Sequence, residues 1–345
     1  MSDAKPSPGQ DGLFGPLAES QRPKRGQRKG GGRIGPAPVE EAVRRAAQAL
    51  PAPLFLGTSS WSFPGWAGLV YDRGATESEL ARDGLQAYAQ HPLFRAAGID
   101  RTYYVPIGAR VFAGYAAAVP DTFRFLVKAH EDCVIARYPH SRRYGARAGA
   151  ENPRFLDPTY ALEAVVTPLV EGLGEKAGPL LFQFPPQDLK RLGGVAAFIE
   201  RLHTFLRALP RNVLYAIELR NEEVLVREYR EALRDVGACH CLNVHPTMPG
   251  IEAQARLMDV LQGPAVVIRW MLGSGLSYEE AVDEYAPFDK IVREDARSRA
   301  EIAALCLQAA PLGRFTYVIV NNKAEGSAPL TLVRLAQEIE ERQSR

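Results

Sequence analysis

Glu218 and Arg220 stand two residues apart near the end of the short apolar run 214–221. If this run is a strand, both side chains point to the same side of it, because residues at i and i+2 share a face. A carboxylate held beside a guanidinium can transfer protons, or it can serve only to orient the guanidinium. We therefore assign Glu218 as a candidate catalytic residue and Arg220 as a candidate substrate-binding residue, with a structural ion pair as the alternative.

Two further cations lie near the ends of apolar runs of the same kind. Lys128 lies in the run 123–130, where its charged amine can bind an anion, the role that the sequence favours, or, if desolvated, can act as a nucleophile. Arg269 lies in the run 265–271, and its guanidinium matches a carboxylate or a phosphate through two parallel hydrogen bonds. We assign Lys128 as the second candidate catalytic residue and Arg269 to binding, and with Arg220 they predict a positive pocket for an anionic ligand.

Amide, hydroxyl and aromatic side chains end the remaining apolar runs. Gln183, Asn321 and Asn322 offer amides that can bind a hydroxyl, a phosphate or a base edge, although Asn also tolerates the sharp turn after a strand. Trp61 can stack on a sugar or base, or it can pack under the first loop. Together with Thr58, these residues complete the predicted binding set at the ends of the apolar runs.

The apolar runs alternate with amphipathic segments along most of the chain. We expect strands at 54–61, 99–104, 123–130, 179–186, 214–221, 238–245, 265–271 and 315–322. We expect helices near 77–90, 107–119, 157–174, 194–209, 222–236, 251–262, 277–309 and 329–342. Eight such units predict a (β/α)8 TIM-like barrel, in which the carboxyl ends of the strands form one mouth.

An open, doubly wound sheet is the alternative fold. Neither a GxGxxG motif after the first predicted strand nor a GxxxxGK[ST] motif occurs, so no nucleotide cofactor supports that alternative, and we expect no cofactor. No apolar stretch approaches the length of a membrane span, and the four Cys are too few for a disulfide scaffold, which favours a cytoplasmic protein with no membrane partner. The sequence indicates no oligomeric state.

The N-terminal segment is basic and low in hydrophobic residues. Residues 1–38 carry seven Lys/Arg against three acids and are rich in Gly, Pro and Ser, so we expect them to be disordered. We assign 1–50 as a disordered basic tail and lead-in, and 51–345 as the barrel. The tail either aids solubility or contacts phosphates, because phosphate attraction needs only exposed positive charge.

A second basic segment follows the third predicted strand. The loop 131–157 includes Arg142 and Arg143 with interleaved Tyr residues, and no acid lies between Cys133 and Ala150. A long loop at the catalytic end of a barrel is often a binding loop. We assign Arg142 and Arg143 to binding an anionic ligand, nucleic acid included, with a solvated loop as the alternative.

Five ordered strings give the chain a family resemblance. They are GTSSWSFPGWAG from Gly57, F-x-F-x-x-K from Phe123, GPLLFQFPP from Gly178, AIELRN from Ala216 and V-N-N-x-x-x-G-x-A-P from Val320. From about Leu54 onward, the sequence resembles the domain-of-unknown-function family 72, also called YecE-like. The resemblance implies a TIM-like barrel and leaves the reaction open, because no activity is established for the family.

Two parts of the sequence depart from the family pattern. Where the family usually reads V-E-I-N-x-T-F-Y, this chain reads A-G-I-D-R-T-Y-Y, with Gly98 in the Glu position and Asp100 in the Asn position. Asn243 stands where many members carry Asp. The loss of two carboxylates argues against a metal site at these positions, because hard cations need carboxylate ligands.

These observations favour an enzyme of the hydrolase or lyase type that acts on an anionic substrate at the barrel mouth, with phosphate-containing compounds among the candidates. Glu218 would be the acid/base group. The alternative is a non-catalytic nucleic-acid-binding protein that uses its basic tail and loop. A third interpretation is a Schiff-base enzyme built on Lys128.

Overall fold

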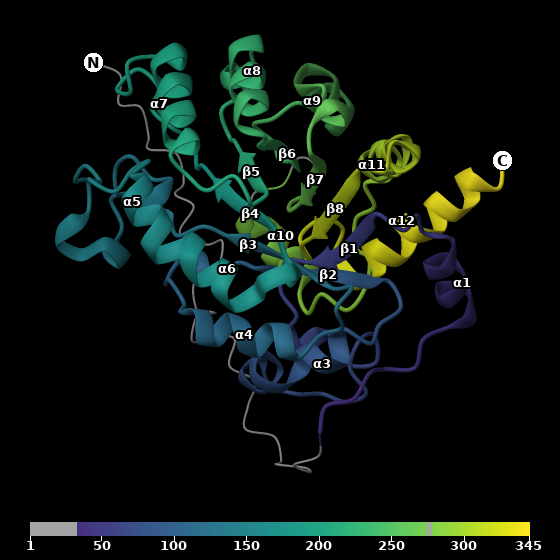
Figure 1. Ribbon diagram of the computed structural model, residues 1–345. Helices are drawn as coiled ribbons and strands as arrows, with labels where there is room; N and C mark the ends of the chain where they lie inside the picture. Colours follow the sequence, from purple (N-terminus) through teal and green to yellow (C-terminus); the bar gives the residue numbers. More distant parts are fainter. Residues whose placement is uncertain (1–32, 274–275, 277) are drawn as a thin grey trace.

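The fold is a closed barrel of eight parallel strands surrounded by helices (Figure 1). The computed structural model describes residues 33–273, 276 and 278–345. The strands are β1 Leu54–Thr58, β2 Phe94–Ile99, β3 Arg124–Lys128, β4 Ala177–Gln183, β5 Tyr215–Glu218, β6 Cys239–Val244, β7 Ala265–Trp270 and β8 Phe315–Val320. Each strand pairs with the next, and β8 pairs with β1. The predicted (β/α)8 TIM-like barrel is confirmed.

The second strand lies earlier in the chain than the sequence indicated. We expected it at 99–104, but β2 ends at Ile99 and the following residues form a helical turn. Its middle consists of small residues, because the neighbouring backbone lies close. A Cβ on Gly98 would lie 2.9 Å from the Cα of Ser59. Small residues weaken the apolar signal that identifies a buried strand.

Most helices lie where the hydrophobic spacing predicted them. The helices are α1 Glu41–Ala49, α2 Glu77–Glu79, α3 Leu85–Tyr88, α4 Ala109–Ala117, α5 Pro158–Ala161, α6 Thr167–Leu173, α7 Val195–Arg207, α8 Arg227–Val236, α9 Ile251–Met258, α10 Tyr278–Tyr285, α11 Ala296–Ala309 and α12 Ala328–Gln343. No helix was predicted where α1 lies. The single helix expected at 277–309 is two helices. Pro287 follows α10 and cannot continue the backbone hydrogen-bond ladder.

Residues 33–38 were predicted to be disordered, and the structure contradicts this. Ile34 and Ala37 are buried, and the Ala37 amide donates to the Val70 carbonyl at 2.9 Å. The prediction was made from the composition of the whole tail, in which the two apolar residues that form these contacts carry little weight. The rest of the predicted tail, residues 1–32, lies outside the described residues.

Helix α1 precedes the predicted start of the barrel and packs against it. Its apolar residues Val43, Ala46 and Ala47 recur at helical spacing and are buried. The helix lies beside α12 (Figure 1), and an ion pair joins Arg45 to Glu340 at 2.9 Å. The lead-in therefore adds an ordered helix to the barrel wall.

The barrel interior has an apolar layer below and a polar layer above. Side chains of the apolar layer are Phe55, Ala96, Leu126, Leu181, Ala216, Cys241, Val267 and Ile319. Because alternate residues of a strand face the same side, the lumen-facing position two residues further along β3 to β8 lies at the mouth. These positions hold Lys128, Gln183, Glu218, Asn243, Arg269 and Asn321.

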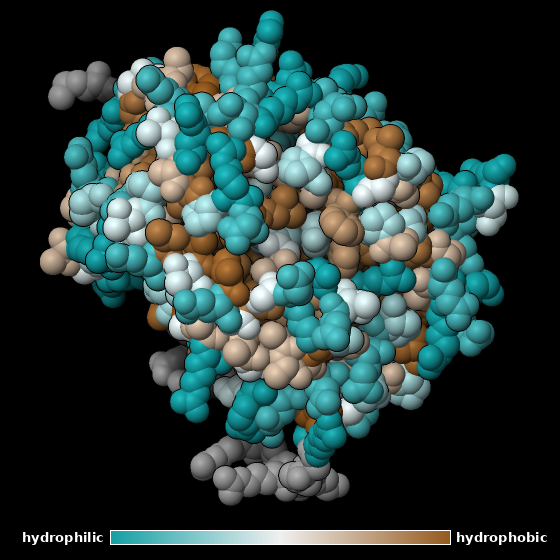
Figure 2. Space-filling view, in the orientation of Figure 1, coloured by the Kyte–Doolittle hydropathy of each residue, from teal (hydrophilic) through white to brown (hydrophobic). Residues whose placement is uncertain are grey.

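The outer surface mixes polar and apolar side chains. On the face shown in Figure 2, hydrophobic residues lie in small groups among hydrophilic ones. Within the described part of the chain, no helix combines the length and apolar character that crossing a membrane requires.

Candidate functional site

The candidate site is the polar layer at the carboxyl ends of the strands. Lys128, Gln183, Glu218 and Arg269 come from four different strands and are each at most 2% exposed. The carboxyl ends of the strands carry the reacting groups in enzymes with this fold. The structure thus brings together four of the residues that the sequence assigned to catalysis or binding.

Glu218 lies between two arginines. Its Oε2 accepts a hydrogen bond from Arg269 Nη1 at 2.7 Å, and its Oε1 forms an ion pair with Arg220 Nη2. Arg269 continues across the barrel, where its Nη2 donates to Asp100 Oδ2 at 2.9 Å. These contacts form one buried network of two carboxylates and two guanidiniums.

The network determines the protonation state of Glu218. Burial alone would raise the pKa of Glu218, but the charges of Arg220 and Arg269 outweigh it and lower the pKa to about 2. A carboxyl with this pKa is ionised at neutral pH and is a poor proton donor or acceptor there. The geometry therefore favours the alternative role, in which Glu218 orients the two guanidiniums.

Asn243 supports Arg220 from the neighbouring strand. Its Oδ1 accepts a hydrogen bond from Arg220 Nη1 at 2.6 Å. Gln254 of α9 in turn binds the backbone of Asn243, donating to its carbonyl at 2.8 Å and accepting from its amide at 3.2 Å. Thus Arg220 is fixed both by Glu218 and by the junction of β6 and α9.

Lys128 differs from the arginines because no carboxylate pairs with it. Among the described residues, none lies within ion-pair or hydrogen-bond distance of its amine, although the side chain is only 1% exposed. Its Nζ lies 3.7 Å above the ring centre of Tyr103. Thr102 anchors the turn that carries this ring, donating its hydroxyl to the Lys128 carbonyl at 2.6 Å. The backbone of Lys128 is fixed while its amine faces the lumen.

Burial lowers the pKa of Lys128 to about 7, because the nearby charge of Asp100 offsets only part of the desolvation. A substantial fraction of this amine is therefore neutral at physiological pH. Lys323, which follows β8, is the second buried lysine of the described residues, and burial lowers its pKa to about 8. Its Nζ donates to Asn321 Oδ1 at 3.2 Å.

Two predicted binding residues face away from the lumen. Thr58 bonds to the Tyr88 hydroxyl at 2.8 Å on the helix side of β1. Asn322 Oδ1 accepts from Trp66 Nε1 at 3.1 Å and from the first amide of α12 at 2.9 Å. Strand alternation gives both residues structural contacts, so we leave them out of the site.

Two further members of the predicted binding set, Asn321 and Trp61, follow β8 and β1. Asn321 faces the lumen and donates to Ser59 Oγ at 2.9 Å. Trp61 is buried and packs edge-on against Tyr115, with 5.0 Å between ring centres. This packing under the first loop is the second of the two roles considered for Trp61.

The loop 131–157 is less basic in effect than its sequence suggests. Arg143 pairs with the buried carboxylate of Glu131 at 2.6 Å and lies 4.3 Å from the ring centre of Tyr104. Arg154 pairs with Asp132 at 3.0 Å. Glu131 and Asp132, the first two residues of the loop, thus neutralise part of its charge, whereas Arg142 is exposed to solvent.

We predict that Arg143 and Arg142 differ in their effect on stability. Arg143→Ala leaves Glu131 buried without its cation and should lower the free energy of unfolding by about 1–2 kcal/mol. Arg142→Ala is the matched control and should change it by less than about 0.5 kcal/mol. Urea unfolding of both variants measures the difference. Equal values would contradict the paired role of Arg143.

Sequence reasoning assigned no role to Tyr103 and did not foresee the support from Gln254. Tyr103 stands in the string A-G-I-D-R-T-Y-Y, at the position where the resembled family usually has Phe. This difference from the family pattern was the one feature of the sequence that could have marked Tyr103 as a site residue. Gln254 lies on a helix face, and nothing local in the sequence shows that it reaches the β6 backbone.

The Cys239–His240–Cys241 string does not form a metal site. Both Cys side chains pack in the lumen, and His240 points outward between Tyr229 and Gln254. In the parts of the chain that the structure describes, no three His, Cys, Asp or Glu side chains converge as metal ligands would.

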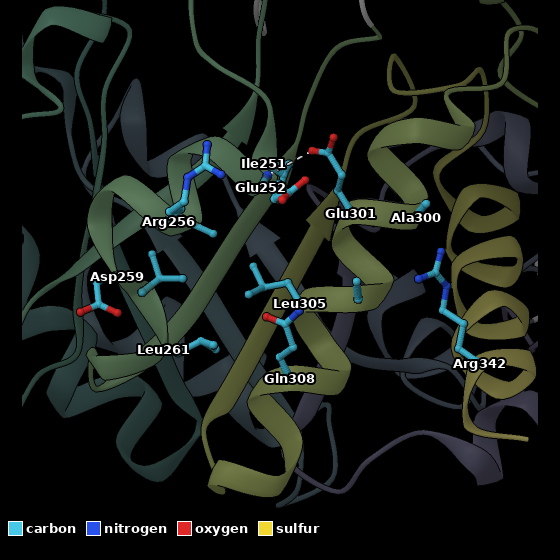
Figure 3. A pocket seen from close by; sticks show the side chains of 13 residues that line it. Ile251, Glu252, Arg256, Asp259, Leu261, Ala300, Glu301, Leu305, Gln308 and Arg342 are labelled. Carbon is cyan, nitrogen blue, oxygen red and sulfur yellow. Dashed lines mark hydrogen bonds between the residues drawn. The ribbon is translucent and has the colours of Figure 1, made fainter. Parts of the chain in front are cut away.

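A separate cavity of about 620 Å³ lies on the outer wall between α9 and α11 (Figure 3). Figure 3 shows Glu301 approaching Glu252, whose amide donates to Glu301 Oε2 at 3.1 Å. Arg342 of α12 lies at its edge and pairs with Glu338 at 2.8 Å. This cavity contains none of the predicted site residues, so we assign the site to the barrel mouth.

A closed parallel barrel with charged side chains at the carboxyl ends of its strands defines a TIM-like barrel protein with a candidate site at the mouth. The model of the family described as "Protein of unknown function DUF72" matches residues 55–345. The chain belongs to the DUF72 family, which confirms the resemblance seen in its motifs.

Solved structures of the same family have a similar fold. A DUF72 family protein from Enterococcus faecalis V583 is 18% identical, with a TM-score of 0.54 over 83% of this chain and 95% of that one. A DUF72 family protein from Thermotoga maritima MSB8 is 20% identical, with a TM-score of 0.53 over 85% of this chain and 99% of that one. No match was found among curated proteins.

Proposed function

We propose that this chain is an enzyme of the lyase type whose reacting group is the amine of Lys128. Its substrate is a small anion, a carboxylate or a phosphate ester, that carries a carbonyl group. The observation that supports this most strongly is a fully buried amine at a strand end with no carboxylate partner among the described residues. Lysines in such surroundings are neutral often enough to act as nucleophiles or bases.

The charge of the mouth supports an anionic substrate. Two carboxylates, Asp100 and Glu218, are already paired there with Arg269 and Arg220. Lys128 adds positive charge beyond that balance whenever it is protonated. A bound anion would compensate for this charge in a site that excludes most solvent.

A neutral Lys128 amine could attack the substrate carbonyl carbon. The oxygen would leave as water with the two amine protons, and a carbon–nitrogen double bond would form. Hydrolysis by an acid/base carboxylate is less compatible with the site, because Glu218 is held ionised by two arginines. We assign Glu218, Arg220 and Arg269 to keeping the side chains of the mouth in place and to setting its electrostatic potential.

The nucleic-acid-binding alternative has weaker support. Arg143 and Arg154 are engaged by acids of the chain, which leaves Arg137 and Arg142 as exposed cations without an ion pair among the described residues of this loop. Phosphate binding along a strand usually relies on several exposed cations and stacking aromatics. The basic residues of 1–32 lie outside the described residues.

Reductive trapping tests the proposed function. The protein is incubated with pyruvate and cyanoborohydride near pH 7, and the modified residue is identified by peptide mass mapping. We expect a single adduct on Lys128, which Lys128→Met removes and the exposed-lysine control Lys290→Met retains. Modification confined to surface lysines, with Lys128 intact, would refute the proposal.

A further inference from the structure

Two buried acceptor atoms flank Lys128 without a donor. Asp100 follows β2 and Gln183 ends β4, so they come from the strands on either side of β3. Asp100 Oδ1 and Gln183 Oε1 are both buried, and no donor from the described residues reaches either of them. Buried polar atoms nearly always have a partner, so each such atom needs an explanation.

Asp100 cannot turn to find a donor of its own. Its Oδ2 is held by Arg269 Nη2 at 2.9 Å, a contact that spans the barrel from β7. Oδ1 is therefore held in the lumen, where it can accept a hydrogen bond. The residue is 6% exposed.

Gln183, on the other side of Lys128, also has a side-chain oxygen without a hydrogen-bond donor. Its side chain is part of the polar layer, is 2% exposed and contributes no hydrogen bond to the network of Glu218. Its amide therefore offers a hydrogen-bond acceptor that the described residues leave unused.

We infer that the substrate presents a hydroxyl group to Asp100 and Gln183, next to the carbonyl carbon that reacts with Lys128. This inference rests on the proposed function and narrows its substrate class to hydroxylated keto or aldehyde anions. Hydroxyl groups donate to carboxylate and amide oxygens, and water can take the same place in the free protein. A site built with fixed acceptors discriminates against an analogue that lacks the donor, because the acceptors then stay unpaired.

An isosteric pair of anions tests the inference. The two anions are hydroxypyruvate and 2-oxobutyrate. On the carbon next to the ketone, the first carries a hydroxyl group and the second carries a methyl group. Binding of each is measured by isothermal titration without reductant, and adduct formation on Lys128 is measured separately by trapping. We expect hydroxypyruvate to bind at least about 10-fold more tightly than 2-oxobutyrate.

Two variants show whether the acceptors cause this preference. Gln183→Met keeps the side-chain length and removes the amide, and Asp100→Asn can keep an oxygen toward Arg269 while placing an NH2 group in the position of Oδ1. Each should reduce the preference to about 3-fold or less, while the surface control Gln308→Met keeps it.

The outcomes separate this inference from the proposed function. Equal binding of the two anions by the wild-type protein, or a preference that both variants retain, would overturn the hydroxyl inference even if Lys128 is trapped. A preference that the variants lose would uphold it even if no adduct forms, and the missing adduct would then count against the proposed function alone.

Discussion

Glu218→Gln should destabilise the protein strongly. The substitution leaves the buried Arg220 without a carboxylate partner and leaves Arg269 with Asp100 alone. Removing one partner of a buried ion pair typically costs about 3–5 kcal/mol, because the remaining charge stays desolvated. We expect a loss of this size in the free energy of unfolding at pH 7, measured by guanidinium denaturation.

The control for this prediction is an exposed pair. Glu231 pairs with Arg227 at 2.6 Å on the surface of α8, and Glu231→Gln should change stability by less than about 0.5 kcal/mol. If Glu218→Gln behaved like this surface variant, the network would not be holding the mouth together, and Glu218 would again be a candidate acid/base residue.

The contribution of Glu218 also has a defined pH dependence. Its pKa in the folded protein is lowered from 4.5 to about 2, so the unfolded chain binds its proton at a higher pH. The stabilising effect is therefore fully present above about pH 4.5 and is lost as the pH falls toward 2. The stability difference between wild type and Glu218→Gln should shrink over the same interval.

Lys128→Met should stabilise the protein and abolish trapping. A decrease in the pKa of Lys128 from 10.5 to about 7 corresponds to roughly 5 kcal/mol of destabilisation when the amine is charged. Met fills similar space without charge, although it gives up the contact with the Tyr103 ring. We expect a net gain of about 2–4 kcal/mol at pH 6 in the free energy of unfolding.

The stability gained by Lys128→Met should be largest at low pH, whereas the stabilisation by Glu218 is lost at low pH. The folded pKa of Lys128 is depressed, so between pH 7 and 10.5 the unfolded chain binds more protons and wild-type stability rises with pH. The advantage of Lys128→Met should be largest below pH 7 and small near pH 10.5. A variant less stable than wild type at pH 6 would show that the charged amine is well accommodated.

The sequence predicted the barrel and most of its mouth because both depend on local periodicity. Strand alternation alone predicts that Lys128, Glu218 and Arg269 occupy lumen-facing positions. It also indicates that His240 and the two Cys beside it face opposite sides, as they do. The shift of β2 arose where close backbone contact requires small residues, which carry little apolar signal.

Contacts between distant parts of the chain were not predictable in this way. The pairing of Arg269 with Asp100 joins residues 169 positions apart, and the bond from Trp66 to Asn322 joins residues 256 positions apart. From these contacts we infer that Glu218 is an ion-pair partner and that Asn322 has a structural role. The unpaired state of Lys128 follows from the same long-range geometry.

The central claim is that Lys128 is a buried amine poised to react near neutral pH. The most direct test is an NMR titration of protein labelled with carbon-13 at lysine Cε, with the Lys128 signal assigned by its loss in Lys128→Met. We predict a titration midpoint for Lys128 close to 7, well below those of the exposed lysines. A midpoint near the ordinary value of about 10.4 would contradict the account.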